Sequence, residues 1–307
     1  MIYSSILDII GNTPIVYLSK LSKFLGANIF AKLENLNPGG SHKVRIALGM
    51  IIDAEKKGIL KRGSGQTIIE PSGGNTGIGL AMAANLFGYK LILVIPDNYS
   101  KEKQKLLKLY GADIVLSDSK LGNNSHGEKA LELQLQNPQY VMLNQQKNSA
   151  NPQAHRETTA LEIVNDFSEM KLDFFIGGIG TGGHITGIGE VIKQKWSDLK
   201  VIGVEPEGCD LINDIHAAHK IQGLSVGIIP SILNTDLLDD MISVDLDECK
   251  DMCKFLLKTE SISIGISSAA NFVAIKKLLE KKKKNKNCNI LTLVYDNLDS
   301  YLDYFNN

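Results

Sequence analysis

Short apolar runs alternate with helical patterns along most of the 307-residue chain, and this alternation restricts the fold more than any other feature. The runs are rich in Ile, Val and Leu and seldom alternate with polar residues, which is typical of parallel strands buried on both faces. We expect strands at residues 67–70, 91–95, 113–116, 140–143, 173–176, 201–205 and 290–295.

Helical patterns fill intervals between these runs, and a glycine follows three of them, which is a common C-terminal stop signal. They cover residues 44–57, 76–87 and 101–110, followed by Gly58, Gly88 and Gly111. Repeated strand–helix–strand units predict a doubly wound α/β architecture. A chain of this length is expected to hold about two domains.

Composition narrows the range of partners. Hydrophobic residues make up 43% of the chain and charged residues 22%, as in an ordinary globular protein. The 33 basic and 34 acidic residues leave a net charge of −1, so we expect neither nucleic acid nor an anionic membrane as a partner. Apolar runs such as 91–95 are far shorter than the roughly 20 residues that a membrane span needs.

Two further features bear on location and metals. No basic residue precedes Lys20, so the charged start of a secretory signal is missing. Four scattered cysteines form no disulfide framework, which indicates a reducing, cytoplasmic location. Cys249 and Cys253 are one helical turn apart with no histidine nearby, so a buried helix face is favoured over a metal pair, and we expect no metal. The KKKKNK run at 281–286 fits a solvated helix end better than a nucleic-acid patch.

Three glycine-rich turns are candidate ligand-binding sites. The first turn (37–43) reads NPGGSHK, the second turn (70–77) reads EPSGGNTG, and the third turn (178–184) reads GIGTGGH. Each leads into a helical pattern. Glycine allows close approach of the backbone to a ligand, and a helix N-terminus offers free N–H groups to an anion.

Each turn also has a plainer reading. In the first turn, Ser41 is a candidate N-cap and Lys43 would then be an exposed lysine. The second turn suits a carboxylate or carbonyl oxygen, although a cap formed by Asn75 or Thr76 would explain part of it. The third turn suits a phosphate. It also matches G-x-G-x-x-G, with Glu205 where a ribose-binding acid would lie, so an NAD-linked oxidoreductase stays open on this turn alone.

Taken together, the turns resemble a known family. The strings NPGGSHKVR, EPSGGNTGIGLA and GIGTGGHITG resemble the β-family of pyridoxal-phosphate enzymes (fold type II, tryptophan synthase β-like). The set is most similar to cysteine synthases (O-acetylserine sulfhydrylases) and cystathionine β-synthases. The similarity covers nearly the whole chain, with further matching strings at 10–18, 151–159, 204–208, 219–230 and 265–270.

The resemblance implies a role for each matching position. Lys43 would form the Schiff base with pyridoxal 5'-phosphate and then move the Cα proton as general base. Asn75 would hydrogen-bond the ring 3′-oxygen, and Ser267 would face the pyridine nitrogen. The cofactor phosphate would be held by Gly180, Thr181, Gly182, Gly183 and His184. The substrate would be bound by Ser72, Gly73, Asn75, Thr76 and Gln145 at its carboxylate and by Gly223 near its amine.

The implied reaction is β-replacement on an O-activated L-serine, either O-acetylserine or O-phosphoserine. It would pass through an aminoacrylate and give L-cysteine or a related β-substituted alanine. A neutral hydroxyl at Ser267 would leave the ring a moderate electron sink, which favours prompt loss of the leaving group. Alternatives within the chemistry are β-elimination (a cysteine desulfhydrase or lanthionine-forming enzyme) and an amine-adding synthase of a diaminopropionate-type product. A non-catalytic regulator with this fold is a further alternative, which the retained Lys43 argues against.

Several residues near the expected pocket depart from the cysteine-synthase pattern, and residues 225–230 read SVGIIP where the family has GAGFIP. His42 and Val44 flank the lysine where the family has Val and Asp, Gly73 lacks the usual hydroxyl, Gln146 replaces a Phe, and His184 replaces a Thr. His42 resembles the tryptophan synthase β-subunit, where a histidine lies by the phosphate. Each histidine alone fits a satisfied polar residue near a helix start, whereas both in one pocket would favour phosphate binding. Altered hydrogen bonding leaves open both the first substrate and the nucleophile, which is sulfide, a thiol or an amine.

The resemblance also implies an organisation. A smaller mobile α/β domain (37–147) would lie over a larger phosphate-binding α/β domain (10–36 and 148–307), both with twisted, mostly parallel sheets. The cofactor would sit between them at the carboxyl ends of the strands. A homodimer and binding of a serine acetyltransferase C-terminal tail are family expectations, the latter weakened by the altered pocket.

Overall fold

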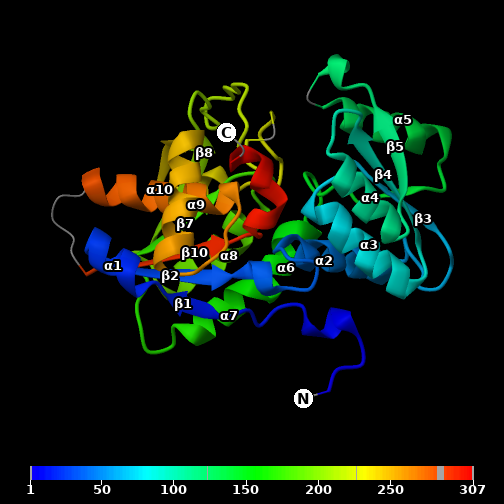
Figure 1. The fold of residues 1–307 in the computed structure, drawn as a ribbon. Coiled ribbons are helices and arrows are strands. Elements are labelled where there is room, and N and C mark those ends of the chain that lie inside the picture. Colours follow the sequence, from blue (N-terminus) through cyan, green and yellow to red (C-terminus); the bar gives the residue numbers. More distant parts are fainter. Residues whose placement is uncertain (1, 123, 226, 282–286, 306–307) are drawn as a thin grey trace.

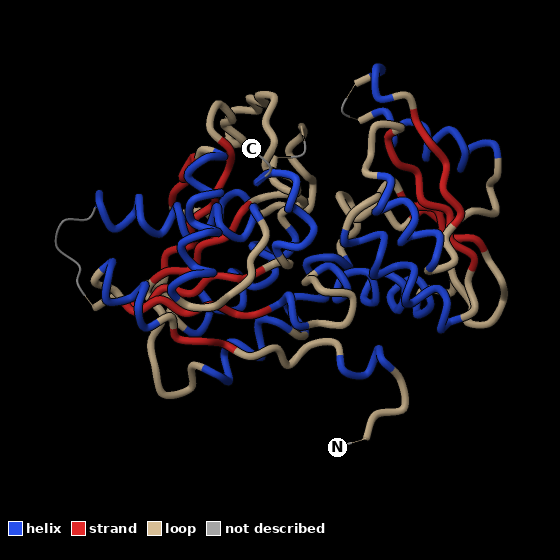
Figure 2. Tube along the Cα trace, in the orientation of Figure 1, coloured by secondary structure: helices blue, strands red, loops and turns tan. Residues whose placement is uncertain are grey.

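The protein has two lobes, each built around one sheet flanked by helices (Figures 1 and 2). The structure is a computed structural model and describes residues 2–122, 124–225, 227–281 and 287–305. Among these residues, no helix combines the length and the apolar character needed to cross a membrane.

The larger lobe contains a sheet of six strands in the described part of the chain, in the order β1-β2-β10-β7-β8-β9. Only the edge pair β1–β2 is antiparallel. The strands are β1 (Ile15–Tyr17), β2 (Asn28–Leu33), β7 (Phe174–Gly178), β8 (Lys200–Pro206), β9 (Asp240–Val244) and β10 (Asn289–Val294). Its helices are α1 (Ser19–Leu25), α7 (Thr159–Asp166), α8 (Gly183–Lys195), α9 (Leu246–Thr259) and α10 (Ile266–Lys281).

The smaller lobe contains a parallel sheet of four strands among the described residues, in the order β5-β4-β3-β6. The strands are β3 (Thr67–Glu70), β4 (Lys90–Pro96), β5 (Asp113–Ser117) and β6 (Val141–Met142). Its helices are α3 (Asn75–Phe87), α4 (Lys101–Leu109) and α5 (Ser125–Gln136). Between the two sheets lie α2 (Lys43–Lys56) and α6 (Ala150–Glu157) (Figure 1). Short 3-10 helices cover Ile6–Ile9, Glu34–Leu36, Ser119–Leu121, Thr235–Leu237 and Leu298–Phe305.

All seven strands expected from the sequence are present, with ends shifted by at most two residues. The sequence did not predict β1, β2 and β9. The four-stranded sheet lies wholly within residues 37–147, while the domain boundary itself stays a prediction.

Two smaller expectations have different outcomes. Cys249 and Cys253 pack into the core of the larger lobe, and the Cys253 thiol contacts the Ile264 carbonyl, which confirms the buried helix face. The N-cap expectation for Ser41 is wrong. Residue His42 caps α2 without a side-chain hydrogen bond, because Ser41 instead forms a β-bridge with Asp296. Of the lysine-rich run, residues 282–286 lie outside the described residues.

A buried ionic network fixes the base of α2 against the larger lobe. The Arg45 guanidinium donates to Glu34 at 2.7 Å and to Glu162 at 2.6 Å. Lys32, on β2, lies 2.8 Å from the second Glu162 oxygen. Lys32 and Glu34 are fully buried, so each charge depends on its partners for the solvation that water would otherwise supply.

Replacing Arg45 by Met is expected to lower the free energy of unfolding by about 3–5 kcal/mol, because Glu34 would remain buried without its main countercharge. Urea denaturation measures this loss. The matched control is Lys57→Met, which removes the half-exposed pair with Asp53 and should cost less than about 1 kcal/mol. Equal losses in the two variants would contradict the assigned role of the network.

Candidate active site

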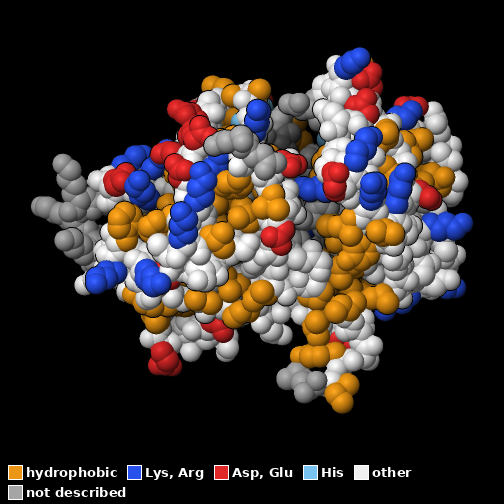
Figure 3. Space-filling view, in the orientation of Figure 1, with side chains coloured by type: hydrophobic (Ala, Val, Ile, Leu, Met, Phe, Trp, Pro, Cys, Tyr) orange, Lys and Arg blue, Asp and Glu red, His pale blue; other side chains and the backbone are white. Residues whose placement is uncertain are grey.

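A cleft of about 620 Å³ opens between the two lobes, where the surface dips at the top of Figure 3. The strands β3, β6, β7 and β10 all end toward it, which is where α/β sheets usually bind ligands. Nearly all predicted site residues line this cleft: Lys43, Ser72, Gly73, Asn75, Thr76, Gln145, Gly180, Thr181, His184, Gly223 and Ser267. The remaining two, Gly182 and Gly183, lie directly behind at the start of α8.

Lys43 lines the cleft with an amine whose pKa is lowered by burial. Lys43 is the first residue of α2 and follows Gly39 and Gly40, whose positive φ angles of 79° and 73° turn the chain into the helix. Desolvation lowers the pKa of Lys43 to about 8, while the nearby Asp296 carboxylate opposes this shift. About a tenth of the amine is therefore neutral at pH 7, far more than for an ordinary lysine, and able to act as a nucleophile or base.

The second turn gathers the residues predicted to bind a carboxylate. Asn75 and Thr76 begin α3, so the free N–H groups of this helix face the cleft. The Thr76 hydroxyl donates to the Gln145 side chain at 2.7 Å, which joins two predicted substrate residues. The amide of Asn75 donates to Asp296 at 2.7 Å across the cleft, from the smaller lobe to the larger.

Buried Glu70 supports this wall, and the sequence analysis did not single it out. It ends β3 and accepts the backbone N–H groups of Asn144 and Gln145 at 2.8 and 2.9 Å. Desolvation raises its pKa to about 7, and these two hydrogen bonds oppose the shift. Glu70 therefore positions Gln145. Its position at the end of a predicted buried strand could have identified it as a candidate site residue from the sequence.

The third turn is packed so closely that two of its glycines have no room for a side chain. A Cβ at Gly180 would collide with the Gly223 carbonyl, and one at Gly183 with the Asn151 side chain. The Gly178 N–H donates to the Tyr295 hydroxyl at 2.8 Å, which fixes the start of the turn.

A cluster of buried imidazoles underlies the third turn. His42, His155 and His184 have ring centroids 5.6 to 6.2 Å apart. The Tyr295 hydroxyl lies 2.9 Å from His184 Nε2. Desolvation, and then Lys43, lower the pKa of His184 to about 3; burial likewise holds those of His42 and His155 well below the usual value. His42 and His184 thus lie in one pocket, the arrangement that the sequence analysis associated with phosphate binding.

The residues present fit the phosphate of pyridoxal phosphate. The turn combines a bare glycine backbone, the N-terminus of α8 and neutral imidazoles that can donate hydrogen bonds. In the described part of the chain, the buried His42 Nδ1 has no hydrogen-bond partner, so this nitrogen could donate to a ligand when the proton is on Nδ1. The sequence analysis missed His155 and Tyr295. Both lie in segments it quoted, but neither shows from sequence that it packs beneath the turn.

The opposite side of the cleft is formed by Ser267 and Asp296. Ser267 is buried in the first turn of α10. Asp296 Oδ2 accepts from Asn75 at 2.7 Å and from the Tyr301 hydroxyl at 2.6 Å. Desolvation raises the pKa of Asp296, opposed by these hydrogen bonds and by Lys103 and Lys43. The sequence analysis did not single out Asp296. It directly follows the last predicted strand, and ligand sites of α/β sheets lie at the carboxyl ends of strands, so the sequence could have pointed to this residue.

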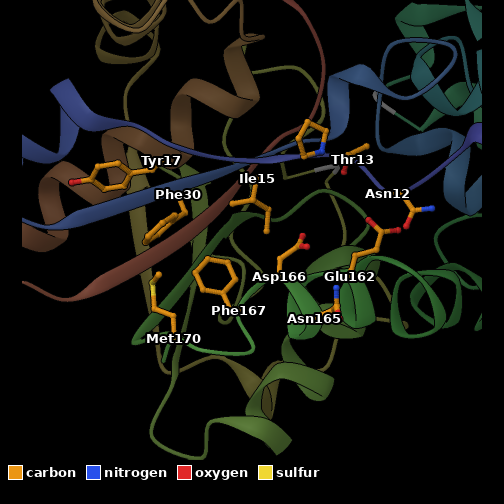
Figure 4. Close-up of a pocket in the computed structure, with 11 residues that line it drawn as sticks. Asn12, Thr13, Ile15, Tyr17, Phe30, Glu162, Asn165, Asp166, Phe167 and Met170 are labelled. Atoms are coloured by element: carbon orange, nitrogen blue, oxygen red, sulfur yellow. The ribbon is translucent and has the colours of Figure 1, made fainter.

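A second hollow of about 450 Å³ lies between β1 and α7 (Figure 4). Its lining includes Glu162, which is already engaged by Arg45 and Lys32, together with Asp166, Phe30 and Phe167. None of the predicted site residues lines it in the described part of the chain.

The NAD-linked interpretation depended on Glu205, and its geometry does not favour that role. The Glu205 Oε2 atom accepts the Leu211 N–H at 2.8 Å, in a buried contact that holds the following loop. The carboxylate that a ribose would need is therefore engaged within the chain.

Comparisons with known proteins agree with the geometry. Residues 6–296 match the family model described as pyridoxal-phosphate dependent enzyme. The chain is 47% identical to a cysteine synthase of a Flavobacterium species, over 86% of this chain and 85% of that protein. The solved structure of O-ureido-L-serine synthase superposes with a TM-score of 0.93 at 36% identity, covering 98% and 94%. A hydrogen sulfide-producing enzyme from Fusobacterium nucleatum gives a TM-score of 0.90 at 40% identity, covering 98% and 100%. The expected fold type II architecture is confirmed, and the chain belongs to the family of pyridoxal-phosphate-dependent enzymes.

Proposed function

We propose that this protein catalyses β-replacement on an O-activated L-serine with pyridoxal phosphate, giving L-cysteine or a related β-substituted alanine. One observation carries the proposal. A lysine amine with a pKa of about 8 faces the same cleft as a turn suited to a carboxylate and a turn suited to a phosphate. Cysteine synthase relatives extend over most of the chain, which supports the same activity.

Bound pyridoxal phosphate supplies an electron-withdrawing ring that acidifies the Cα–H bond of an attached amino acid. The backbone from Gly180 to Gly183 and the imidazole of His184 would hold its phosphate. The neutral hydroxyl of Ser267 would lie near the pyridine nitrogen and leave it unprotonated. Lys43 would hold the cofactor and would carry the Cα proton on its Nζ atom.

The second turn orients the substrate. Ser72, Gly73, Asn75 and Thr76 bind the α-carboxylate through N–H groups and hydroxyls at the start of α3, and Gln145 closes this site through Thr76. Gly223 leaves space near the substrate amine. The smaller lobe, proposed as residues 37–147, moves toward the larger lobe when substrate binds.

The nucleophile separates this function from its alternatives. One similar structure is named for O-ureido-L-serine synthesis and another for hydrogen sulfide production. An amine-type nucleophile and β-elimination therefore stay as alternatives to sulfide addition. From the family resemblance we also propose a cytoplasmic homodimer, with a serine acetyltransferase tail as a candidate partner.

Product analysis with O-acetylserine, O-phosphoserine and cysteine, each with and without sulfide, tests the function. We expect cysteine from an O-activated serine only when sulfide is present. Pyruvate formed equally fast without sulfide would instead indicate β-elimination. A colourless protein that binds NAD and lacks pyridoxal phosphate would overturn the proposal.

Borohydride treatment of the purified protein should fix the cofactor on Lys43, as read by peptide mass analysis. Lys43→Ala should abolish fixation and lower turnover by at least about a hundredfold, because both the attachment point and the general base are lost. The control Lys56→Ala removes an exposed lysine at the other end of α2 and should change neither. Fixation at another lysine would contradict the assignment.

The rate at which cofactor-free protein captures pyridoxal phosphate should depend on pH. Since the pKa of Lys43 is about 8, the neutral amine fraction rises roughly tenfold per pH unit well below that value and levels off above it. Stopped-flow absorbance measures the capture rate. Nα-acetyl-lysine, with an ordinary amine pKa of about 10.4, should keep rising in rate past pH 9. A protein profile that follows the free amine would show that Lys43 is not desolvated.

A further inference from the structure

Lys103 places a second positive charge in the cleft that the reaction described above does not use. It lies in the first turn of α4, is half-buried and lines the cleft, whereas its neighbours Lys101 and Lys105 are exposed. Among the ion pairs formed by the described residues, none includes Lys103. An ammonium without a paired carboxylate in a partly dry cleft is ready to receive an anion.

Aromatic rings and the facing wall hold this ammonium in position. The Nζ atom lies 5.8 Å from the ring centroid of Tyr99 and 5.4 Å from that of Tyr301, within the range of cation–π attraction. It also donates to the Gln222 side chain at 3.4 Å, across the cleft from the larger lobe. Desolvation lowers the pKa of Lys103, and Asp296 opposes the shift.

The departure at Gly73 belongs to the same feature. A Cβ at Gly73 would lie 2.8 Å from both the Tyr99 ring and the Ile95 side chain, so the ring occupies the space that a larger residue would need. Burial raises the pKa of Tyr99 to about 12, which keeps its hydroxyl neutral and able to donate. Tyr99 therefore lies beside the second turn on one side and beside Lys103 on the other.

We propose that Lys103, with the Tyr99 hydroxyl, binds a second anionic group in addition to the substrate α-carboxylate. This subsite rests on the proposed β-replacement and narrows its substrate class. The anion is a phosphate or carboxylate, carried either by the leaving group of the activated serine or by an amino-acid nucleophile. Acetate esters and bare sulfide carry no such group, so they leave the subsite unused.

Steady-state kinetics of Lys103→Met with three substrate pairs tests the subsite. With O-acetylserine and sulfide, KM should stay within about twofold of the parent value. With O-phosphoserine and sulfide, or with O-acetylserine and cysteine, the KM of the anion-bearing partner should rise about tenfold or more, since a charge-assisted hydrogen bond is lost. The pair affected identifies whether the leaving group or the nucleophile carries the anion.

Two variants and one binding measurement complete the test. Lys103→Arg keeps the charge, so its KM for the anion-bearing partner should stay close to the parent value. Lys105→Met should also match the parent, because that lysine is exposed. Calorimetry of the holoenzyme compares 2-amino-4-phosphonobutyrate, an unreactive phosphoserine analogue, with 2-aminobutyrate. We expect the phosphonate to bind more tightly to the parent, and Lys103→Met to remove that preference.

These outcomes separate the subsite from the proposed function. If the parent protein turns over none of the pairs, the proposed function fails and the calorimetric comparison alone decides on Lys103. Equal changes in all three pairs, no change in any, or the same change in Lys105→Met would overturn the subsite.

Discussion

The arrangement of the cleft depends on the contacts that surround the buried carboxylate of Asp296. It is fully desolvated, yet it receives hydrogen bonds from Asn75 of the smaller lobe and Tyr301 of the larger. Its negative charge also faces the Lys43 and Lys103 amines. A buried charge is tolerated only when such partners replace water. In this structure, these contacts bring the base of α2 and the start of α3 together at Asp296.

The parts of the fold that the sequence predicted depend on patterns of residues that are close together in the chain. Parallel strands buried on both faces appear as apolar runs, and glycines reveal turns that need close backbone approach. In contrast, β2 carries Lys32 in its buried interior, and its charge is matched by Glu162 far along the chain. No local pattern shows that pairing. The roles of Glu70, His155 and Tyr295 likewise arise only from tertiary packing around the turns.

His42 and His184, which both depart from the cysteine-synthase pattern, belong to one cluster in the structure. His42 precedes the reactive lysine and His184 begins α8, yet their rings lie 5.6 Å apart and both contact the Tyr295 ring. Burial keeps these imidazoles neutral, so they offer hydrogen bonds without bringing net charge into the third turn. A phosphate held there would be stabilised by backbone N–H groups and the α8 N-terminus, while the positive charge of the cleft would come from its lysines.

Steric exclusion shapes the wall of the cleft beside the second turn. Since the ring of Tyr99 fills the space above Gly73, a side chain at position 73 and the ring at position 99 exclude one another. Exchanging one without the other would either force a collision or leave a void, so the two positions are coupled. The centroid of the same ring lies 5.8 Å from the Lys103 Nζ atom, so Tyr99 adjoins both the second turn and that lysine. If Lys103 binds a second anion as proposed, Gly73, Tyr99 and Lys103 would determine substrate preference together.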